Sequence, residues 1–527
     1  MLIIFRHMPP QKELFFSFQS CIVKGGFCIL RHTHSIRHAH ARRAHSFSKT
    51  AGAVRGFYPK EVLFLKGFSI PAALSGTVRR KRRDPTRMIV SSFLAVIACG
   101  TLLLLLPSAS RAGHPPHWME ALFTATSATC VTGLTAFDTY TQFSSLGQVI
   151  ILLLIQIGGL GLVTLTSFFH IAIGRRLGFQ GLRLAGESIS LSDAGQSRAV
   201  LQFVIKVAFL FEGAGAVLLA LSFVPRFGAR GIFIAIFLSV STFCNAGFDI
   251  LGFLEPGASL TAYGNDPYVL AVISVLIIGG GLGFLVWQDL AAWRRTHHLR
   301  THTRLVLWVT GGLFVIGTLG ILLLESQNPR TLGPLPPGEK LLHAAFQSVS
   351  ARTAGCNTFP LDQMGDITKI FMTILMFIGA APGGTGGGVK VTTVSVILLA
   401  IAGVASGRDE AMIFGRRIGH KTVYRALTIL LLSLVACVTV TLALFYNVNA
   451  AEPSVVDCMF EAVSAFATVG LTVGVTAVMN PAARAVTLAA KFLGRVGPVS
   501  LAISLAARRD SAAARRTVPP EAHINVG

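Results

Sequence analysis

Long apolar segments alternate with shorter, half-apolar segments along most of the chain. The long ones occupy residues 89–106, 146–173, 200–224, 268–290, 305–324, 367–378 together with 389–404, 423–445 and 483–506. Many approach the roughly 20 apolar residues with which a helix crosses a bilayer. Between the two members of each successive pair lies a segment too short to span, at 118–128, 231–242, 339–351 and 454–465. The pattern predicts an all-α membrane protein with four short helices between its spans.

The four short segments are copies of one another. Each contains Phe, any residue, a small residue, a β-branched residue, Ser and another small residue, and a glycine follows the serine by five or six positions. These glycines are separated by 114, 108 and 115 residues, and they are Gly133, Gly247, Gly355 and Gly470. A near-constant period indicates a repeat architecture. We therefore expect four helix–pore loop–helix repeats with pseudo-fourfold symmetry around one central pore, since irregular backbone at membrane depth is tolerated where it is buried or lines a cavity.

The repeats divide the chain into consecutive parts. We place repeat 1 at 88–198, repeat 2 at 199–298, repeat 3 at 299–421, with a broken second helix, and repeat 4 at 422–507. Residues 1–87 form a basic extension with five histidines between His32 and His45. We expect this extension to be cytoplasmic and poorly ordered, and residues 508–527 to be a short cytoplasmic tail.

The loops that end in these glycines offer main-chain groups and no catalytic constellation. A dehydrated monovalent cation needs rings of carbonyl oxygens in place of its hydration shell, and glycine lets the backbone approach an axis closely. We predict a selectivity filter built from Val131, Thr132, Gly133, Asn245, Ala246, Gly247, Thr353, Ala354, Gly355, Thr468, Val469 and Gly470.

Composition and charge narrow the class of protein. Of the 527 residues, 52% are hydrophobic and 13% are charged, against about 25% charged in soluble domains, which excludes an ordinary soluble enzyme.

The net charge of +23 would suggest a nucleic-acid partner if the protein were soluble. Here the loops on one predicted side carry 23 Lys and Arg and those on the other carry five. That asymmetry indicates a multi-pass protein of the plasma or bacterial inner membrane, embedded in the lipid bilayer, with both termini cytoplasmic and no nucleic-acid partner.

The sequence resembles the Ktr/Trk/HKT superfamily of potassium transporters, most closely the KtrB-type membrane subunit. The resemblance covers roughly residues 83–507, and seven motifs carry it in order: 126–135 (TSATCVTGLT), 157–162 (IGGLGL), 241–248 (STFCNAGF), 346–358 (FQSVSARTAGCNT), 376–393, 460–472 (FEAVSAFATVGLT) and 492–501 (FLGRVGPVSL). It implies potassium uptake, with a potassium site lined by Gly133, Gly247, Gly355 and Gly470.

A glycine-rich stretch in the third repeat predicts a broken helix. Residues 379–388 contain six glycines and a proline, and each glycine costs a helix about 1 kcal/mol and proline about 3 kcal/mol. The stretch is not a phosphate-binding loop, because valine follows Lys390. The resemblance implies that this break is a gate, whose matching residues are Gly383, Gly384, Thr385, Gly386, Gly387, Gly388, Lys390 and, in the final helix, Arg495.

Several positions depart from the family pattern. The gate stretch lacks the family's serines, Ala467 stands where glycine is common, and Lys491 stands where an apolar residue is usual. Lys491 either extends to the membrane interface or alters conduction. Arg352 matches the family motif, and we expect it behind the filter and paired there, because a cation in the pathway would repel potassium.

The resemblance also implies partners. These are a second copy of the chain in a homodimer and a cytoplasmic ring of nucleotide-binding, KtrA/TrkA-like regulatory subunits. We expect no organic cofactor in this chain, since its GGGLG stretch near Gly281 lies in a predicted apolar helix and so does not match a dinucleotide-binding turn.

Two alternative functions remain at this stage. One is a sodium-selective or sodium-coupled carrier, although the resemblance associates serine, not glycine, at the position of Gly133 with sodium preference. The other, from a different class, is a membrane enzyme or metal-handling protein that uses the N-terminal histidines. It predicts that deletion of residues 1–78 abolishes function, whereas a transporter that is not an enzyme tolerates the deletion.

Overall fold

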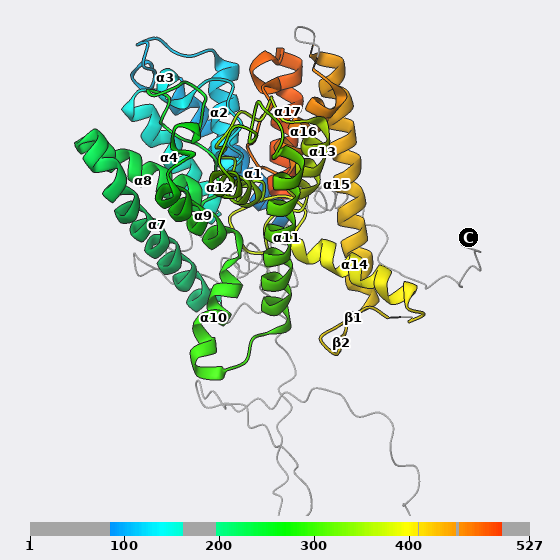
Figure 1. Ribbon diagram of the computed structural model, residues 1–527. Coiled ribbons are helices and arrows are strands. Elements are labelled where there is room, and N and C mark those ends of the chain that lie inside the picture. Colours follow the sequence, from blue (N-terminus) through cyan, green and yellow to red (C-terminus); the bar gives the residue numbers. More distant parts are fainter. Residues whose placement is uncertain (1–84, 162–196, 409, 449–452, 498–527) are drawn as a thin grey trace, which may run out of the picture. The chain divides into compact units, whose positions relative to one another are not determined.

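The computed structural model describes residues 85–161, 197–408, 410–448 and 453–497, and these are mostly helical, with 69% of them in helices (Figure 1). The long helices and their continuations are α1 (Pro85–Leu104), α4 (Ser145–Leu160), α7 (Ser197–Phe227), α9 (Pro267–Gly281), α10 (Phe284–Thr296), α11 (Thr301–Glu325), α13 (Asp366–Phe377), α14 (Val391–Ala405), α15 (His420–Asn447) and α17 (Pro481–Val496). The short ones are η2 (Pro107–Ala109), α3 (Thr139–Gln142), η3 (Thr261–Tyr263) and η4 (Val475–Val478). One hairpin pairs β1 (Met412–Ile413) with β2 (Arg416–Arg417).

Four further helices lie where the repeated short segments predict them. They are α2 (Trp118–Cys130), α8 (Ala229–Phe243), α12 (Pro337–Ser350) and α16 (Val455–Phe466). Local sequence fixes where they begin: a capping box of Ser454 and Asp457 starts α16, and Pro337 occupies the first turn of α12. Both devices satisfy or remove the unpaired N–H groups of a helix start. Each short helix packs on the long helix that precedes it in the chain.

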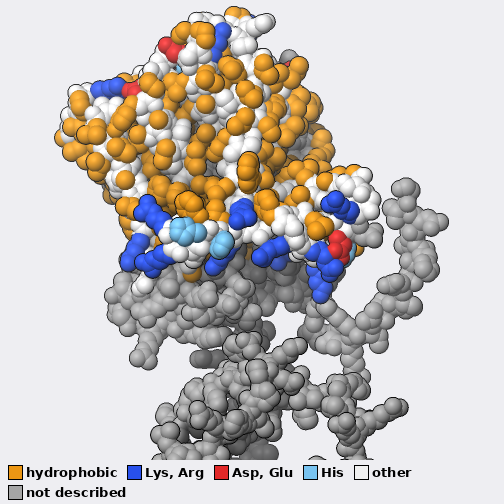
Figure 2. All heavy atoms as spheres, turned by 60° about the horizontal axis from the view of Figure 1, so that its bottom comes forward, with side chains coloured by type: hydrophobic (Ala, Val, Ile, Leu, Met, Phe, Trp, Pro, Cys, Tyr) orange, Lys and Arg blue, Asp and Glu red, His pale blue; other side chains and the backbone are white. Residues whose placement is uncertain are grey.

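The longest helices have the length and the surface of membrane spans. Val200–Phe227, Thr301–Glu325 and His420–Asn447 are long and apolar enough to cross a bilayer. Their outer faces expose large apolar side chains such as Leu221, Leu323 and Leu442, which are 63–77% exposed. Figure 2 shows this hydrophobic surface with Lys and Arg gathered along its lower margin. The arrangement is that of a membrane protein whose apolar band ends at a basic rim.

The second helix of the second repeat differs from its prediction. One apolar helix is expected over 268–290, but the structure breaks it after Gly281, and α9 and α10 meet at 97°. Gly283 takes a φ of 88°, a left-handed conformation that favours glycine. The Phe284 N–H, which a continuous helix would bond internally, donates to the carbonyl of Gly383 at 3.1 Å. The glycine-rich segment thus stabilises the break.

The third repeat is interrupted at the glycine-rich segment. Helix α13 ends at Phe377 and α14 begins at Val391, and the ends of the intervening segment pair through an isolated bridge between Ile378 and Val389. In Figure 1, α14 is turned sideways at the lower end of α15, on which it packs.

Some expectations lie outside the described residues. These concern residues 1–84 of the extension, the tail 508–527, and the far ends of two predicted spans, 162–173 and 498–506. Within the described part, α4 ends at Leu160 and α17 at Val496, each followed by a glycine of positive φ.

Candidate functional site: a ring of four loops

The four loops that follow α2, α8, α12 and α16 share one backbone conformation. The residue two positions before each glycine has a positive φ although it is not glycine: 57° at Val131, 57° at Asn245, 72° at Thr353 and 53° at Thr468. The glycines themselves have φ values of 86°, 67°, 80° and 96° at Gly133, Gly247, Gly355 and Gly470. Residues of alternating handedness gather N–H groups on one face of a loop and leave carbonyls to the other. Such strained positions cluster at functional sites.

The four glycines close a ring in chain order. A Cβ built on Gly133 would lie 2.6 Å from the carbonyl oxygen of Ala246, and one on Gly247 would lie 2.8 Å from that of Ala354. The same holds for Gly355 toward Val469, and for Gly470 toward Thr132, which returns to the first loop. No side chain fits at these distances, so each position requires glycine. The structure thus brings the twelve predicted filter residues together.

Each short helix has its C-terminal end three to five residues before its ring glycine. A helix C-terminus carries a partial negative charge from its unpaired carbonyls. None of these four described helices has a basic side chain in its last turn. Four converging C-terminal ends therefore favour a cation at the ring.

The repeated serines hold the outgoing end of three loops. Ser241 and Ser464 donate to the carbonyls of Phe248 and Leu471, each at 2.6 Å, and Ser350 donates to that of Cys356. Each acceptor directly follows a ring glycine. In these three repeats the serine is therefore a structural support of the ring, a role that the sequence pattern alone does not reveal.

Three second helices meet the short helices through a glycine. A Cβ on Gly158, Gly280 or Gly494 would overlap the carbonyl oxygen of Thr129, Phe243 or Phe466, each four residues before a ring glycine. A second glycine follows each of these by three residues, just after the helix ends. It has a φ of 81–89° and a ψ of 131–141°, and the three are Gly161, Gly283 and Gly497. Sequence reasoning missed this feature, although its signal, two glycines three positions apart, is present in all three helices.

The glycine-rich segment lies directly against the ring. A Cβ on Gly386 or Gly387 would overlap the hydroxyl oxygen of Thr353 or Thr468. The Thr385 hydroxyl donates to the carbonyl of Phe243 at 3.0 Å. Glycine at 386 and 387 lets the segment approach the loops this closely.

Three basic side chains hold the segment through its main chain. Lys390 donates to the carbonyl of Gly386 at 2.7 Å. Arg495 donates to the carbonyls of Thr385 and of Gly158, and so joins the segment to α4. Arg352 donates to the carbonyl of Gly379 at 3.0 Å and lies over the ring of Phe314. Gly383 and Gly384 instead contact the break between α9 and α10. Of the predicted gate residues, all but Arg495 therefore lie in this segment or directly after it, and Arg495 binds it from α17.

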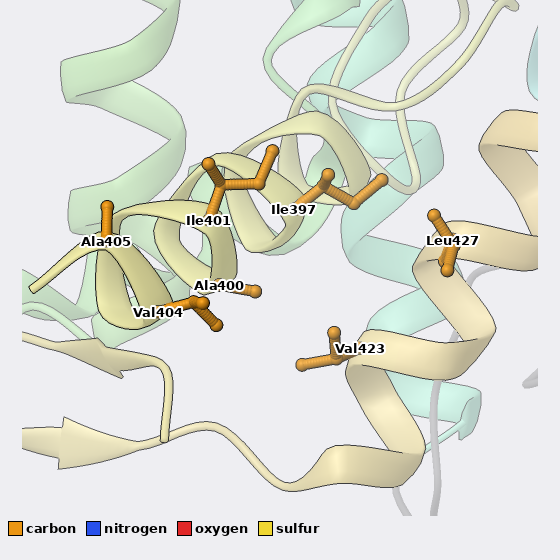
Figure 3. A pocket seen from close by; sticks show the side chains of 7 residues that line it. All are labelled: Ile397, Ala400, Ile401, Val404, Ala405, Val423 and Leu427. Carbon is orange, nitrogen blue, oxygen red and sulfur yellow. The ribbon is translucent and has the colours of Figure 1, made fainter. Parts of the chain in front are cut away.

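A hollow in the described residues lies away from this ring. It has a volume of about 440 Å³ and lies between α14 and α15 (Figure 3). The side chains around it are aliphatic: Ile397, Ala400, Ile401, Val404, Ala405, Val423 and Leu427. It offers no ligand for an ion. Likewise, no cluster of three His, Cys, Asp or Glu that could hold a metal occurs among the described residues, and the N-terminal histidines lie outside them.

Comparison with known proteins identifies the family. The model of the family described as "TrkH: Cation transport protein" matches residues 72–516. The chain belongs to the TrkH family of cation transport proteins. Within it, the chain is a KtrB-type transporter and not an enzyme, as its resemblance implies.

Relatives of this TrkH-family chain match it over most of both lengths. Potassium/sodium uptake protein NtpJ of Enterococcus hirae is 37% identical over 444 residues, covering 84% of this chain and 97% of that protein. Ktr system potassium uptake protein B of Bacillus subtilis is 36% identical over 431 residues, covering 82% and 95%. The crystal structure of the potassium transporter TrkH from Vibrio parahaemolyticus has the same fold, with a TM-score of 0.62 at 18% identity over 81% of this chain and 86% of that one.

Proposed function

We propose that this chain takes up potassium across the cell membrane through a single selectivity filter, which the four loops form around one axis. The observation that carries the proposal is the closed ring, in which each glycine faces a carbonyl of the next loop. Carbonyls arranged around an axis can replace the hydration shell of potassium. The shared loop conformation and the shared glycine contacts support four repeats with pseudo-fourfold symmetry.

Potassium is the preferred ion on two grounds. Relatives that match nearly full length are named potassium uptake proteins, and the first loop carries glycine at 133. The sodium alternative stays in view because the name of NtpJ includes both ions. Competition of sodium against rubidium uptake distinguishes the two, since a potassium filter resists excess sodium.

We infer that residues 378–390 form the gate. Held by Lys390, Arg352 and Arg495, the segment closes one side of the ring, and conduction requires it to move away. Inward flux would be driven by the membrane potential, which is worth about 2.3 kcal/mol per charge per 100 mV.

The movement would be controlled from outside this chain. Relatives named as component B of a Ktr system support a multi-component assembly. We propose a homodimer on a cytoplasmic ring of nucleotide-binding subunits. The exposed arginines at the end of α10, before α11 and on the β1–β2 hairpin lie on the side that we assign to the cytoplasm. The charge asymmetry of the sequence favours the same assignment for both termini.

The test is rubidium uptake by cells that lack their own potassium transporters. Gly133→Asp and Gly470→Ser are compared with Gly113→Asp and Gly474→Ser at matched membrane levels. The control glycines also have positive φ, but no described atom lies within 4 Å of the Cβ that a substitution would add. We expect the ring variants to lose flux or selectivity and the controls to retain both. Equal behaviour of ring and control variants would contradict the proposal.

A further inference from the structure

The first repeat supports its loop differently from the other three. In repeats two, three and four, a serine hydroxyl donates to the carbonyl that follows the ring glycine. In the first repeat the corresponding serine is Ser127 and the corresponding carbonyl is that of Leu134. Ser127 is fully buried, and its hydroxyl has no hydrogen-bond partner among the described residues.

Lys491 supplies the missing donor. Its Nζ donates to the carbonyl oxygen of Leu134 at 3.0 Å, across 357 positions of sequence. The side chain is fully buried in α17 and therefore does not extend to an interface, one of the two possibilities left open by the sequence. Its Nζ also lies 3.3 Å from the centroid of the Phe123 ring, in a cation–π contact.

Burying the amino group of a lysine costs free energy unless the group is hydrogen-bonded, so it needs a specific partner. Here the partner is the one loop carbonyl that the serine pattern leaves unpaired. Phe123 is also the repeated phenylalanine of the first short helix, so both contacts of the amino group belong to the first repeat. The fourth repeat, through α17, therefore holds the loop of the first.

We propose that Lys491 is a positioning residue of the filter, which fixes Gly133 through Leu134 and thereby sets the preference for potassium over sodium. The inference rests on the proposed function. The ring closes only if all four loops keep the same position along the axis, because Gly470 lies against the carbonyl of Thr132 in this same first loop. Releasing Leu134 frees the two carbonyls on either side of Gly133 to adapt to a smaller ion.

The experiment compares three substitutions by rubidium uptake with sodium or potassium as competitor. Lys491→Met and Ser464→Ala each remove the support of one loop, whereas Ser127→Ala removes a hydroxyl that supports none. We expect the first two to lower the preference for potassium over sodium about tenfold, since each leaves a buried carbonyl unpaired. We expect Ser127→Ala to keep the wild-type preference.

A matched control separates positioning from folding. Thr487→Val changes a buried residue one turn earlier in α17, whose hydroxyl bonds stay within residues 479–487. It should leave selectivity unchanged even where it lowers the amount of protein in the membrane. If Lys491→Met does not reach the membrane, the contrast between Ser127→Ala and Ser464→Ala still tests whether the first loop, unlike the fourth, is held without its serine.

Either of two results would overturn the inference: wild-type selectivity in Lys491→Met, or a loss in Ser127→Ala equal to that in Ser464→Ala. Absence of rubidium uptake by the unmodified chain would instead count against the proposed function, so the two failures are distinguishable.

Discussion

At the scale of single residues, glycine is required at the site because neighbouring carbonyl groups leave no space for a side chain. The ring glycines combine a positive φ with a neighbouring carbonyl, so both backbone conformation and space exclude a side chain. Gly158, Gly280 and Gly494 are helical, and only space excludes a side chain there. The sequence identifies the first group because each of its members follows a repeated serine by five or six positions. The second group is missed because a glycine in an apolar helix looks unremarkable until its neighbour is known.

The glycines of the second helices give a prediction about stability. Gly494→Ala places a methyl group on the carbonyl of Phe466, and overpacking of this kind costs about 1–3 kcal/mol. We expect a lower Tm of the detergent-solubilised protein than for the wild type. Gly312→Ala, in α11, is the control, since no described atom lies within 4 Å of its Cβ and alanine favours the helix by about 1 kcal/mol. An equal Tm for the two variants would contradict the assigned contact.

At the scale of elements, the sequence predicts those that depend on a local or repeated pattern, and it does not predict those that depend on contacts between distant residues. The four short helices were predicted because the same pattern recurs four times, and the break at 379–388 was predicted because of its glycine content. The break after Gly281 was not predicted, because residues 268–287 contain no charged side chain and the stabilising contact to Phe284 comes from Gly383, 99 positions away. The partners of Arg352 and Lys491 were beyond prediction for the same reason, whereas the family resemblance already grouped Arg495 with the glycine-rich segment that it contacts.

The contacts of the glycine-rich segment give a prediction about gating. Lys390→Met removes the donor to the carbonyls of Gly386 and Gly387, so the segment should leave the ring more readily. We expect higher rubidium uptake than in the wild type when no regulatory subunit is present. Ser395→Ala is the control, because that hydroxyl bonds within α14 to Val391. Unchanged or reduced uptake in Lys390→Met, with normal membrane levels, would show that this bond does not keep the segment closed.

At the scale of the whole molecule, parts of the chain that are far apart in sequence meet at one point. The ring joins loops from all four repeats, Lys491 ties the last helix to the first loop, and Arg495 ties it to both α4 and the glycine-rich segment. A mostly helical fold with apolar spans followed from the long apolar segments, and the helices of the structure and its likeness to TrkH confirm that much. The pore, the homodimer and the regulatory ring remain proposals.

The central claim is that the four loops together bind one dehydrated potassium ion. Anomalous diffraction from crystals of the chain grown with thallium or rubidium in place of potassium tests it most directly. We predict a peak inside the ring, among the carbonyls of Thr132, Ala246, Ala354 and Val469, and its loss in Gly470→Ser. An ordered ring without a peak, or a peak that persists in Gly470→Ser, would contradict the account.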